Sequence, residues 1–295
     1  MKKRRCTMSR PYVIECCRAG AIGDVLMTTP AVRALRQKHP DALIRFVTMN
    51  PDLLLENPDI DEISPVNLEA NRTVWFEYPV KDGYPDVPLQ DHLAREFARS
   101  NGIPVMEIAG RICFTKSERS FARTLVRKFS PLPVATIHIK AGWSPYKEWP
   151  VENWQQVVNH FFGRLVFIQI GGRNEPVLKN AVTMNGVMNI RLSAACVAES
   201  DLFLGIDSFP NHVAGAFKKP AVVIFGSTSP VGSGYPTATN LWSGEDCSPC
   251  YREYNAIAVH RKEPCPYAVK CQKNITVAAV IEAIETKLKN LNHTP

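Results

Sequence analysis

An aspartate stands where the first strand of the chain is expected to turn into a helix. Asp24 lies in the segment 20–30, GAIGDVLMTTP, which follows a stretch with strand character. A helix start favours a negative charge, so this carboxylate could simply cap the helix. If it faces a substrate cleft instead, it is suited to act as a general base. The segment lacks the G-x-G-x-x-G spacing, so a dinucleotide-binding fingerprint is not supported.

Two lysines follow a predicted strand in the segment 138–150. Lys140 and Lys147 lie there beside two tryptophans, in a loop that leads to the next helix. A lysine can neutralise a phosphate as a point charge. Loop lysines are also commonly solvated, so the segment taken alone favours neither interpretation.

A third segment, 205–212, runs from a predicted strand into a predicted helix. Asp207 and Ser208 precede the helix, and His212 lies one turn inside it. The free amides of a helix start form a ready anion site. His212 is therefore either a structural histidine or part of such a site.

Four of the nine cysteines cluster near the C-terminus with the spacing C-x2-C-x14-C-x5-C, namely Cys247, Cys250, Cys265 and Cys271. A C-x-x-C pair places two thiolates on one ion, and two later thiolates complete a tetrahedron, which suits zinc or a mononuclear iron. Four protein ligands leave no open coordination position on the metal, so the predicted role of the ion is structural. It would hold the segment 244–273 in place. Reduced structural thiols are the alternative; a redox-active pair fits less well.

Two similar α/β patterns must position these groups. A proline-rich break, 130–133, separates a first half, 11–130, from a second half, 131–295, in which the pattern restarts. The order of elements predicts two doubly wound domains, which bind ligands at the carboxyl ends of their strands and hence between the halves. Strands are expected at 12–17, 43–48, near 63, 73–78, 134–139, 165–170, 201–206 and 221–225, and helices at 25–38, 92–101, 117–129, 151–162, 210–217 and 277–288.

Composition limits the classes of protein that this chain can be. Its 295 residues are 45% apolar and 21% charged, which suits a globular protein of about two domains. The net charge is +7, but five of these charges lie in a basic tail, residues 1–10, and the remainder is close to neutral. The tail is either a solvated terminus or a contact with anionic membrane lipid. No apolar run is long enough to span a membrane, and no signal peptide is predicted, so a cytoplasmic protein is expected.

In their order and spacing, these segments resemble glycosyltransferase family 9, the ADP-heptose:lipopolysaccharide heptosyltransferases and their relatives, over nearly the whole chain. The segment 22–30 resembles the opening motif of the family, in which Asp24 matches the proposed catalytic base. The segment 147–150 resembles the K-x-W-P element, whose lysine contacts the donor diphosphate; this role falls on Lys147.

The resemblance continues through the second half of the chain. Gly171, Gly172 and Glu175 resemble the loop whose acid reaches the donor nucleoside. Asp207, Ser208 and His212 match D-[S/T]-G-x-x-H-x-A, which holds the donor sugar and phosphates. Phe209 stands where the family usually has glycine, so its ring is expected to change the sugar pocket.

The resemblance implies a fold and an activity. The fold is GT-B, two Rossmann-like domains facing across a cleft, with the acceptor in the N-terminal domain and an ADP-activated sugar in the C-terminal one. The reaction is an inverting transfer of a sugar, heptose in the family, to a hydroxyl of a glycolipid, lipopolysaccharide or other glycan, without a catalytic metal. Similar cysteine sets occur in autotransporter heptosyltransferases of the family, where the metal is iron.

Two other functions are compatible with the same features. A sugar-nucleotide epimerase on this fold would need no acceptor. A metal-stapled protein that binds nucleic acid would use the cysteine cluster and the basic tail. The near-neutral body argues against the second alternative, so no nucleic-acid partner is expected. A transferase peripheral at the inner membrane, near a glycolipid acceptor, is the preferred interpretation.

Overall fold

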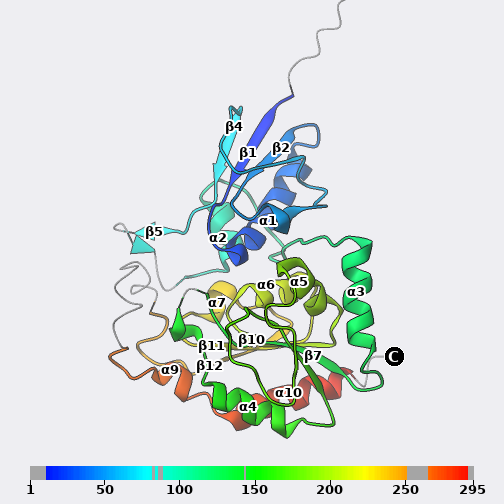
Figure 1. The fold of residues 1–295 in the computed structure, drawn as a ribbon. Helices are drawn as coiled ribbons and strands as arrows, with labels where there is room; N and C mark the ends of the chain where they lie inside the picture. The colour runs from blue at the N-terminus through cyan, green and yellow to red at the C-terminus, as the bar shows by residue number, and fades with distance from the viewer. Residues whose placement is uncertain (1–10, 82–83, 86–88, 143, 251–264, 292–295) are drawn as a thin grey trace, which may run out of the picture.

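Four short parallel strands form the sheet of the N-terminal half (Figure 1). Along the chain they are β1 (Val13–Cys17), β2 (Leu43–Val47), β3 (Glu62–Ser64) and β4 (Arg72–Trp75). In the sheet they lie in the order β3-β2-β1-β4. The structure is a computed structural model that describes residues 11–81, 84–85, 89–142, 144–250 and 265–291. Parallel pairing brings the carboxyl ends of these strands to one edge, so the segment after β1 reaches the second half.

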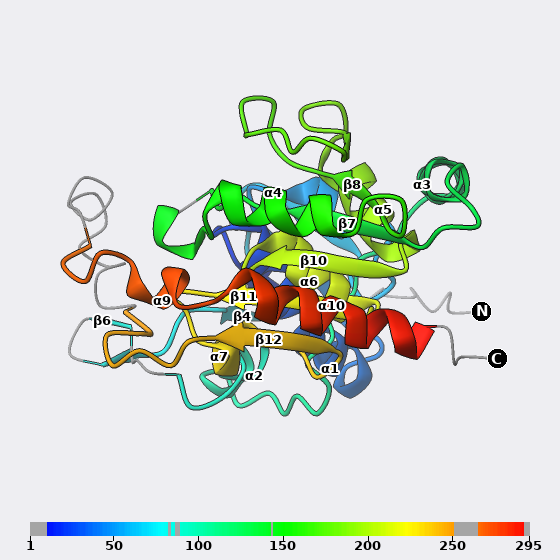
Figure 2. The same cartoon turned by 90° about the horizontal axis from the view of Figure 1, so that it is seen from below.

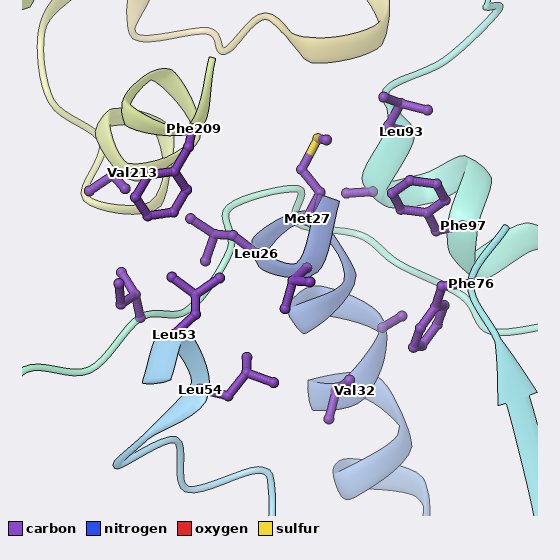
Figure 3. Close-up of a cluster of buried hydrophobic side chains, with 14 of the residues drawn as sticks. Leu26, Met27, Val32, Leu53, Leu54, Phe76, Leu93, Phe97, Phe209 and Val213 are labelled. Carbon is purple, nitrogen blue, oxygen red and sulfur yellow. The ribbon is translucent and has the colours of Figure 1, made fainter. Parts of the chain in front are cut away.

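Helix α1 (Ile22–Lys38) packs its apolar side chains into the core of the N-terminal half. Figure 3 shows Leu26 and Val32 of α1 close to Leu54 of the 3-10 helix η1 (Pro51–Leu54), with Phe97 of α2 (Leu93–Arg99) on the other side. A small antiparallel hairpin, β5 (Val80–Lys81) with β6 (Tyr84–Pro85), precedes α2.

Six parallel strands form the sheet of the C-terminal half, in the order β12-β11-β10-β7-β8-β9. Strands β10 and β11 are buried along their whole lengths, as expected for a parallel sheet covered on both faces. The strands are β7 (Val134–His138), β8 (Val166–Gln169), β9 (Val182–Thr183), β10 (Leu202–Ile206), β11 (Ala221–Phe225) and β12 (Ala238–Trp242).

Helices cover both faces of this second sheet. Figure 2 shows α4 (Val151–His160) and α10 (Val277–Leu291) lying across its outer face. The opposite face packs against α5 (Ile190–Glu199) and α6 (Phe209–Ala216), and α6 also contacts α1 of the N-terminal half. The remaining short elements are η2 (Pro145–Lys147), α7 (Pro230–Ser233) and α9 (Lys270–Lys273). No helix in the described ranges has both the length and the apolar character needed to cross a membrane.

Helix α3 (Lys116–Arg127) precedes the predicted domain boundary near Ser130 but packs against α5 of the C-terminal half (Figure 1). The domain limits 11–130 and 131–295 stay a prediction, and α3 links the two units across that limit. Its N-cap is Thr115, which forms a capping box with Glu118, so the helix begins at Lys116, one residue before the predicted start. Thr115 fits because Glu118 then occupies the third helical position, where its carboxylate reaches back to the cap amide.

A buried arginine on α5 ties the two halves together. Arg191 pairs with Glu118 through two hydrogen bonds of 2.6 and 2.7 Å. It also donates to the carbonyl oxygens of Asp52 at 2.7 Å and Cys113 at 2.8 Å. The hydrogen bonds from Arg191, with a smaller contribution from Thr115, lower the pKa of Glu118 to about 2.

Replacing Arg191 with methionine is expected to destabilise the protein by about 3–5 kcal/mol, because Glu118 then loses its partner in a partly buried site. A carboxyl whose pKa is lowered on folding stabilises the native state above its unfolded pKa. This stabilisation is lost as the pH falls from about 4.5 toward 2. Urea unfolding at pH 7 and pH 3 measures both effects: the cost of Arg191→Met should shrink at pH 3.

Arg164→Met provides a control for this experiment. Arg164 pairs with Glu285 at 3.0 Å, but its side chain is 53% exposed, so the loss should be within about 1 kcal/mol. Equal losses for the two variants at pH 7 would mean that Arg191 does not tie the halves together.

The structure confirms each main strand and helix predicted in the chain, with shifted ends. The first helix begins at Ile22 instead of Val25, which places Asp24 in its first turn. The second helix is shorter than expected and begins after His92, whose ring accepts from the amide of Ala94. No elements were predicted where α5 and β12 lie.

Candidate active site

A cavity of about 520 Å³ lies between the two halves, a size that suits a nucleotide-sized ligand. The N-terminal half contributes the start of α1, and the C-terminal half contributes the loops that follow its strands. All the site residues predicted outside the cysteine cluster line this cavity: Asp24, Lys147, Gly171, Gly172, Glu175, Asp207, Ser208 and His212. Segments far apart in the sequence therefore meet at one place.

Asp24 is held by two donors from its own half. Its carboxylate forms an ion pair with Arg18, and its other oxygen accepts a hydrogen bond of 2.9 Å from the Tyr78 hydroxyl. The residue is only 9% exposed and lies in the first turn of α1, where the helix dipole favours its negative charge. Asp24 is thus an oriented carboxylate at the cavity wall.

His212 approaches the start of α1 from the facing half. A Cβ atom at Gly23 would lie 2.8 Å from Cδ2 of His212, so only glycine permits this contact. The other side of the ring is fixed, because Nδ1 of His212 shares a hydrogen bond of 3.1 Å with the Tyr235 hydroxyl. Burial lowers the pKa of His212, although the charges of Asp207 and Asp24 oppose this effect. The charges of both carboxylates therefore act on the imidazole of His212.

Lys147 and Asp207 form a pair on the C-terminal side of the cavity. Lys147 Nζ donates to Asp207 Oδ2 at 2.9 Å, and Asp207 is almost completely buried. Burial alone would raise the pKa of Asp207, but the charges of Lys147 and His212 outweigh it and hold that pKa below its usual value. The pair offers an ammonium group next to the first turn of α6.

Glu175 closes the end of the cavity beside the Gly171–Gly172 turn. Its Oε1 accepts a hydrogen bond of 2.7 Å from the amide of Gly172. A side chain at Gly171 would collide with the same carboxylate. Burial raises the pKa of Glu175, partly offset by its bond to Gly172. Gly171 is therefore needed for close packing of this acid against the turn.

Ser208 is the N-cap residue of α6, but its side chain makes no capping hydrogen bond there. Its hydroxyl instead lies 3.0 Å from Nδ1 of His138, whose pKa burial lowers to about 4. Lys140, the second lysine of the loop, pairs with Glu148 and also lines the cavity. The loop thus supplies one lysine to Asp207 and one to Glu148.

Phe209 does not fill the cavity with its ring. The residue borders the cavity, but it is 7% exposed and its ring packs near Leu26 and Val213 in the core between the halves (Figure 3). The side chain of Phe209 is thus used for packing between the halves, and the expected effect of its ring on the sugar pocket stays a prediction.

Three residues of the site were missed in the sequence: Arg18, Tyr78 and Tyr235. Each contacts a predicted site residue without matching a motif of its own. The one local signal in the sequence was Arg18, an arginine six residues before Asp24.

The cysteine cluster lies at the C-terminal end of the second half. Cys271 is 5% exposed, and burial together with the nearby Cys247 and Cys265 thiols raises its pKa to about 11. The amide of Cys250 bonds to the carbonyl of Ser227 at 3.0 Å. Within the described ranges, no three ligand-type side chains are arranged to hold a metal ion. The predicted basic tail, 1–10, lies outside the described residues.

Comparisons with known proteins agree with this architecture. The chain is similar in structure to a family 9 glycosyl transferase from Veillonella parvula DSM 2008 (18% identity, 95% of this chain and 97% of that chain, TM-score 0.74). It is also similar to ADP-heptose lps heptosyltransferase II from E. coli (14% identity, 95% and 99%, TM-score 0.70). No curated protein matches the sequence.

A third similar structure is the dodecameric iron-containing heptosyltransferase TibC in complex with ADP-D-β-D-heptose (16% identity, 95% of this chain and 77% of that chain, TM-score 0.72). TibC comes from enterotoxigenic E. coli H10407. At these identities the likeness establishes the GT-B fold of two parallel sheets. The model of glycosyltransferase family 9 (heptosyltransferase) matches residues 75–259. Because this match covers most of the chain, the protein belongs to glycosyltransferase family 9 and is a glycosyltransferase.

Proposed function

We propose that the protein transfers heptose from an ADP-activated donor to a hydroxyl of a glycolipid or other glycan, with inversion at the anomeric carbon. The observation that carries this proposal is the cavity between the halves, which places Asp24 opposite Lys147, Asp207 and His212. A carboxylate on one wall and an ammonium group on the other suit a reaction that removes a proton on one side and releases a diphosphate on the other.

The chemistry follows from this arrangement. Asp24 accepts the proton of the acceptor hydroxyl as its oxygen bonds to the anomeric carbon. The bond from that carbon to the β-phosphate oxygen breaks at the same time, and ADP leaves. Lys147 and the amides in the first turn of α6 stabilise the charge that develops on the diphosphate. Lys147 supplies this positive charge, so the proposal needs no catalytic divalent ion.

The donor subsite is the C-terminal side of the cavity. Gly171, Gly172 and Glu175 would hold the nucleoside, and Asp207, Ser208 and His212 the sugar and phosphates. TibC, a similar structure, was solved with ADP-D-β-D-heptose, which supports an ADP-sugar here. The acceptor would enter from the N-terminal half, and the basic tail, 1–10, would hold the enzyme near anionic lipid of the inner membrane.

A thermal-shift series with ADP, ADP-heptose, UDP-sugars and GDP-sugars tests the donor class. Ligand at about 100 times its Kd adds about 2.7 kcal/mol to stability, which corresponds to a rise in Tm of several degrees. We expect this rise with ADP and ADP-heptose only. Asp24→Asn should respond like the wild type, because Asp24 acts on the acceptor. An equal response to UDP-sugars or GDP-sugars would remove the ADP-sugar assignment.

We also propose that Cys247, Cys250, Cys265 and Cys271 hold a structural zinc or iron ion. Three of these thiols lie close enough for Cys247 and Cys265 to affect the titration of Cys271, which supports a shared site. A bound ion would draw the thiolates together and fix the end of the chain before α10. The iron in TibC is consistent with such an ion in a relative.

Metal analysis and a visible absorption spectrum of the purified protein test this site, since a thiolate-bound iron absorbs visible light and zinc does not. The double variant Cys247→Ser, Cys250→Ser should lose the ion and melt at a lower temperature. Cys113→Ser, outside the cluster, should keep it. Protein that is metal-free yet melts like the metal-supplemented protein would refute the proposed staple.

A further inference from the structure

We infer that Arg18 and Tyr78 are positioning residues that together orient the Asp24 carboxylate for the acceptor, an inference that rests on the proposed role of Asp24 as the base. Each oxygen of this carboxylate has its own donor: Arg18 reaches Oδ2, and the Tyr78 hydroxyl reaches Oδ1 at 2.9 Å. A carboxylate bonded at both oxygens cannot rotate freely, yet each oxygen keeps a second lone pair.

Arg18 is itself held on several sides. It donates to the carbonyl oxygen of Phe76 at 2.8 Å. Its guanidinium lies 4.8 Å from the centre of the Tyr78 ring and 4.9 Å from the centre of the Phe97 ring. Planar guanidinium groups stack well on aromatic faces, and the two rings restrict its movement. These contacts fix the arginine by packing, and the arginine in turn fixes Asp24.

Tyr78 has a double role in this arrangement. Its ring contacts the guanidinium, and its hydroxyl bonds to the carboxylate. Burial raises the pKa of Tyr78 well above its usual value, with Asp24 adding to the effect, so the hydroxyl keeps its proton and stays a donor. The ring also meets Phe97 edge-on, with centroids 5.3 Å apart. The unit formed by Arg18, Tyr78 and Phe97 is called the Asp24 clamp below.

The clamp holds the base from its own half, while other charged groups face it from across the cavity. The other titratable groups that bear on this site are His212, which responds to the charge of Asp24, and Asp207, which bears on both His212 and Tyr78. His212 and Asp207 both lie on the facing half of the cavity. The clamp, in contrast, belongs to the same half as Asp24.

The variant Tyr78→Phe isolates the effect, because it keeps the ring against Arg18 and removes only the hydroxyl. We expect kcat to fall about 10-fold, since a charge-assisted hydrogen bond is lost. The KM for the ADP-sugar should stay within about twofold, because none of the clamp residues lines the cavity. A purely structural role for the hydroxyl would lower Tm but leave kcat per folded molecule unchanged.

A double-mutant cycle makes the coupling explicit. Tyr78→Phe should have little further effect on kcat when Asp24→Asn is already present, because the hydroxyl then has no base to orient. Arg18→Lys should lower kcat as well, since lysine cannot bond to Phe76 and Asp24 in the same fork. Tyr12→Phe, at a half-exposed tyrosine far from the cavity lining, should behave like the wild type.

The outcomes separate the inference from the proposed function. If Asp24→Asn keeps near wild-type kcat, the role of Asp24 as the base fails and the clamp has no function to support. If Asp24→Asn inactivates the enzyme but Tyr78→Phe and Arg18→Lys keep wild-type kcat, the clamp is refuted while the base stands.

Discussion

Asp24→Asn is expected to lower kcat by about 10²–10⁴-fold with little change in donor affinity, because a general base contributes about that factor. Asparagine has nearly the same shape, so it should leave the packing at the start of α1 intact, but it cannot accept the proton of the acceptor hydroxyl. Donor affinity should survive because the donor groups lie on the facing half of the cavity. A transfer assay with a matched ADP-sugar and acceptor, read as separate kcat and KM values, measures the effect.

Asp24→Asn removes both the proposed base and the ion pair with Arg18, so a control must show the effect of losing an ion pair alone. Asp59 is also buried, at 6% exposure, and pairs with Arg111 at 2.7 Å, but it does not line the cavity. Asp59→Asn therefore removes a comparable ion pair and should leave kcat per folded molecule within about twofold. Turnover by Asp24→Asn within tenfold of the wild type would mean that another group accepts the proton.

The sequence was sufficient for the architecture because the strands are marked by local patterns. Continuous apolar runs such as Leu202–Ile206 indicate strands buried on both faces, and their alternation with helices indicates a parallel sheet. The motifs predicted Asp24, Lys147 and His212 as site residues, and all three line the cavity because the segments that follow parallel strands meet at one edge of the sheet.

Other features depend on contacts that no local pattern encodes. Helix α5 begins at Ile190, and its buried positions are one arginine, two alanines, one cysteine and one valine, so its apolar stripe is weak. Arg191 resembles a surface residue in the sequence, yet it is buried because Glu118 and two carbonyl groups from distant segments surround it. Tyr78 likewise becomes part of the site only when the chain after β4 passes beside α1.

Lys147→Met is expected to weaken binding of ADP and ADP-sugar by about 100-fold or more, a loss in the range seen for buried charge pairs. Two effects act in the same direction. The diphosphate loses its cation in a partly desolvated cavity, and the negative charge of Asp207, 2.9 Å from the ammonium, is left facing it without compensation. Isothermal titration with ADP measures the change in Kd directly, and the methionine keeps most of the volume of the lysine stem.

The second effect predicts a rescue. Asp207→Asn added to Lys147→Met removes the uncompensated charge, so the double variant should bind ADP more tightly than Lys147→Met alone, although more weakly than the wild type. Lys218→Met is the matched control, because Lys218 pairs with Glu107 at 2.7 Å and lies outside this cavity. Unchanged ADP affinity in Lys147→Met would exclude Lys147 as the diphosphate ligand. A double variant no better than the single one would mean that Asp207 acts on the donor by hydrogen bonding rather than through its charge.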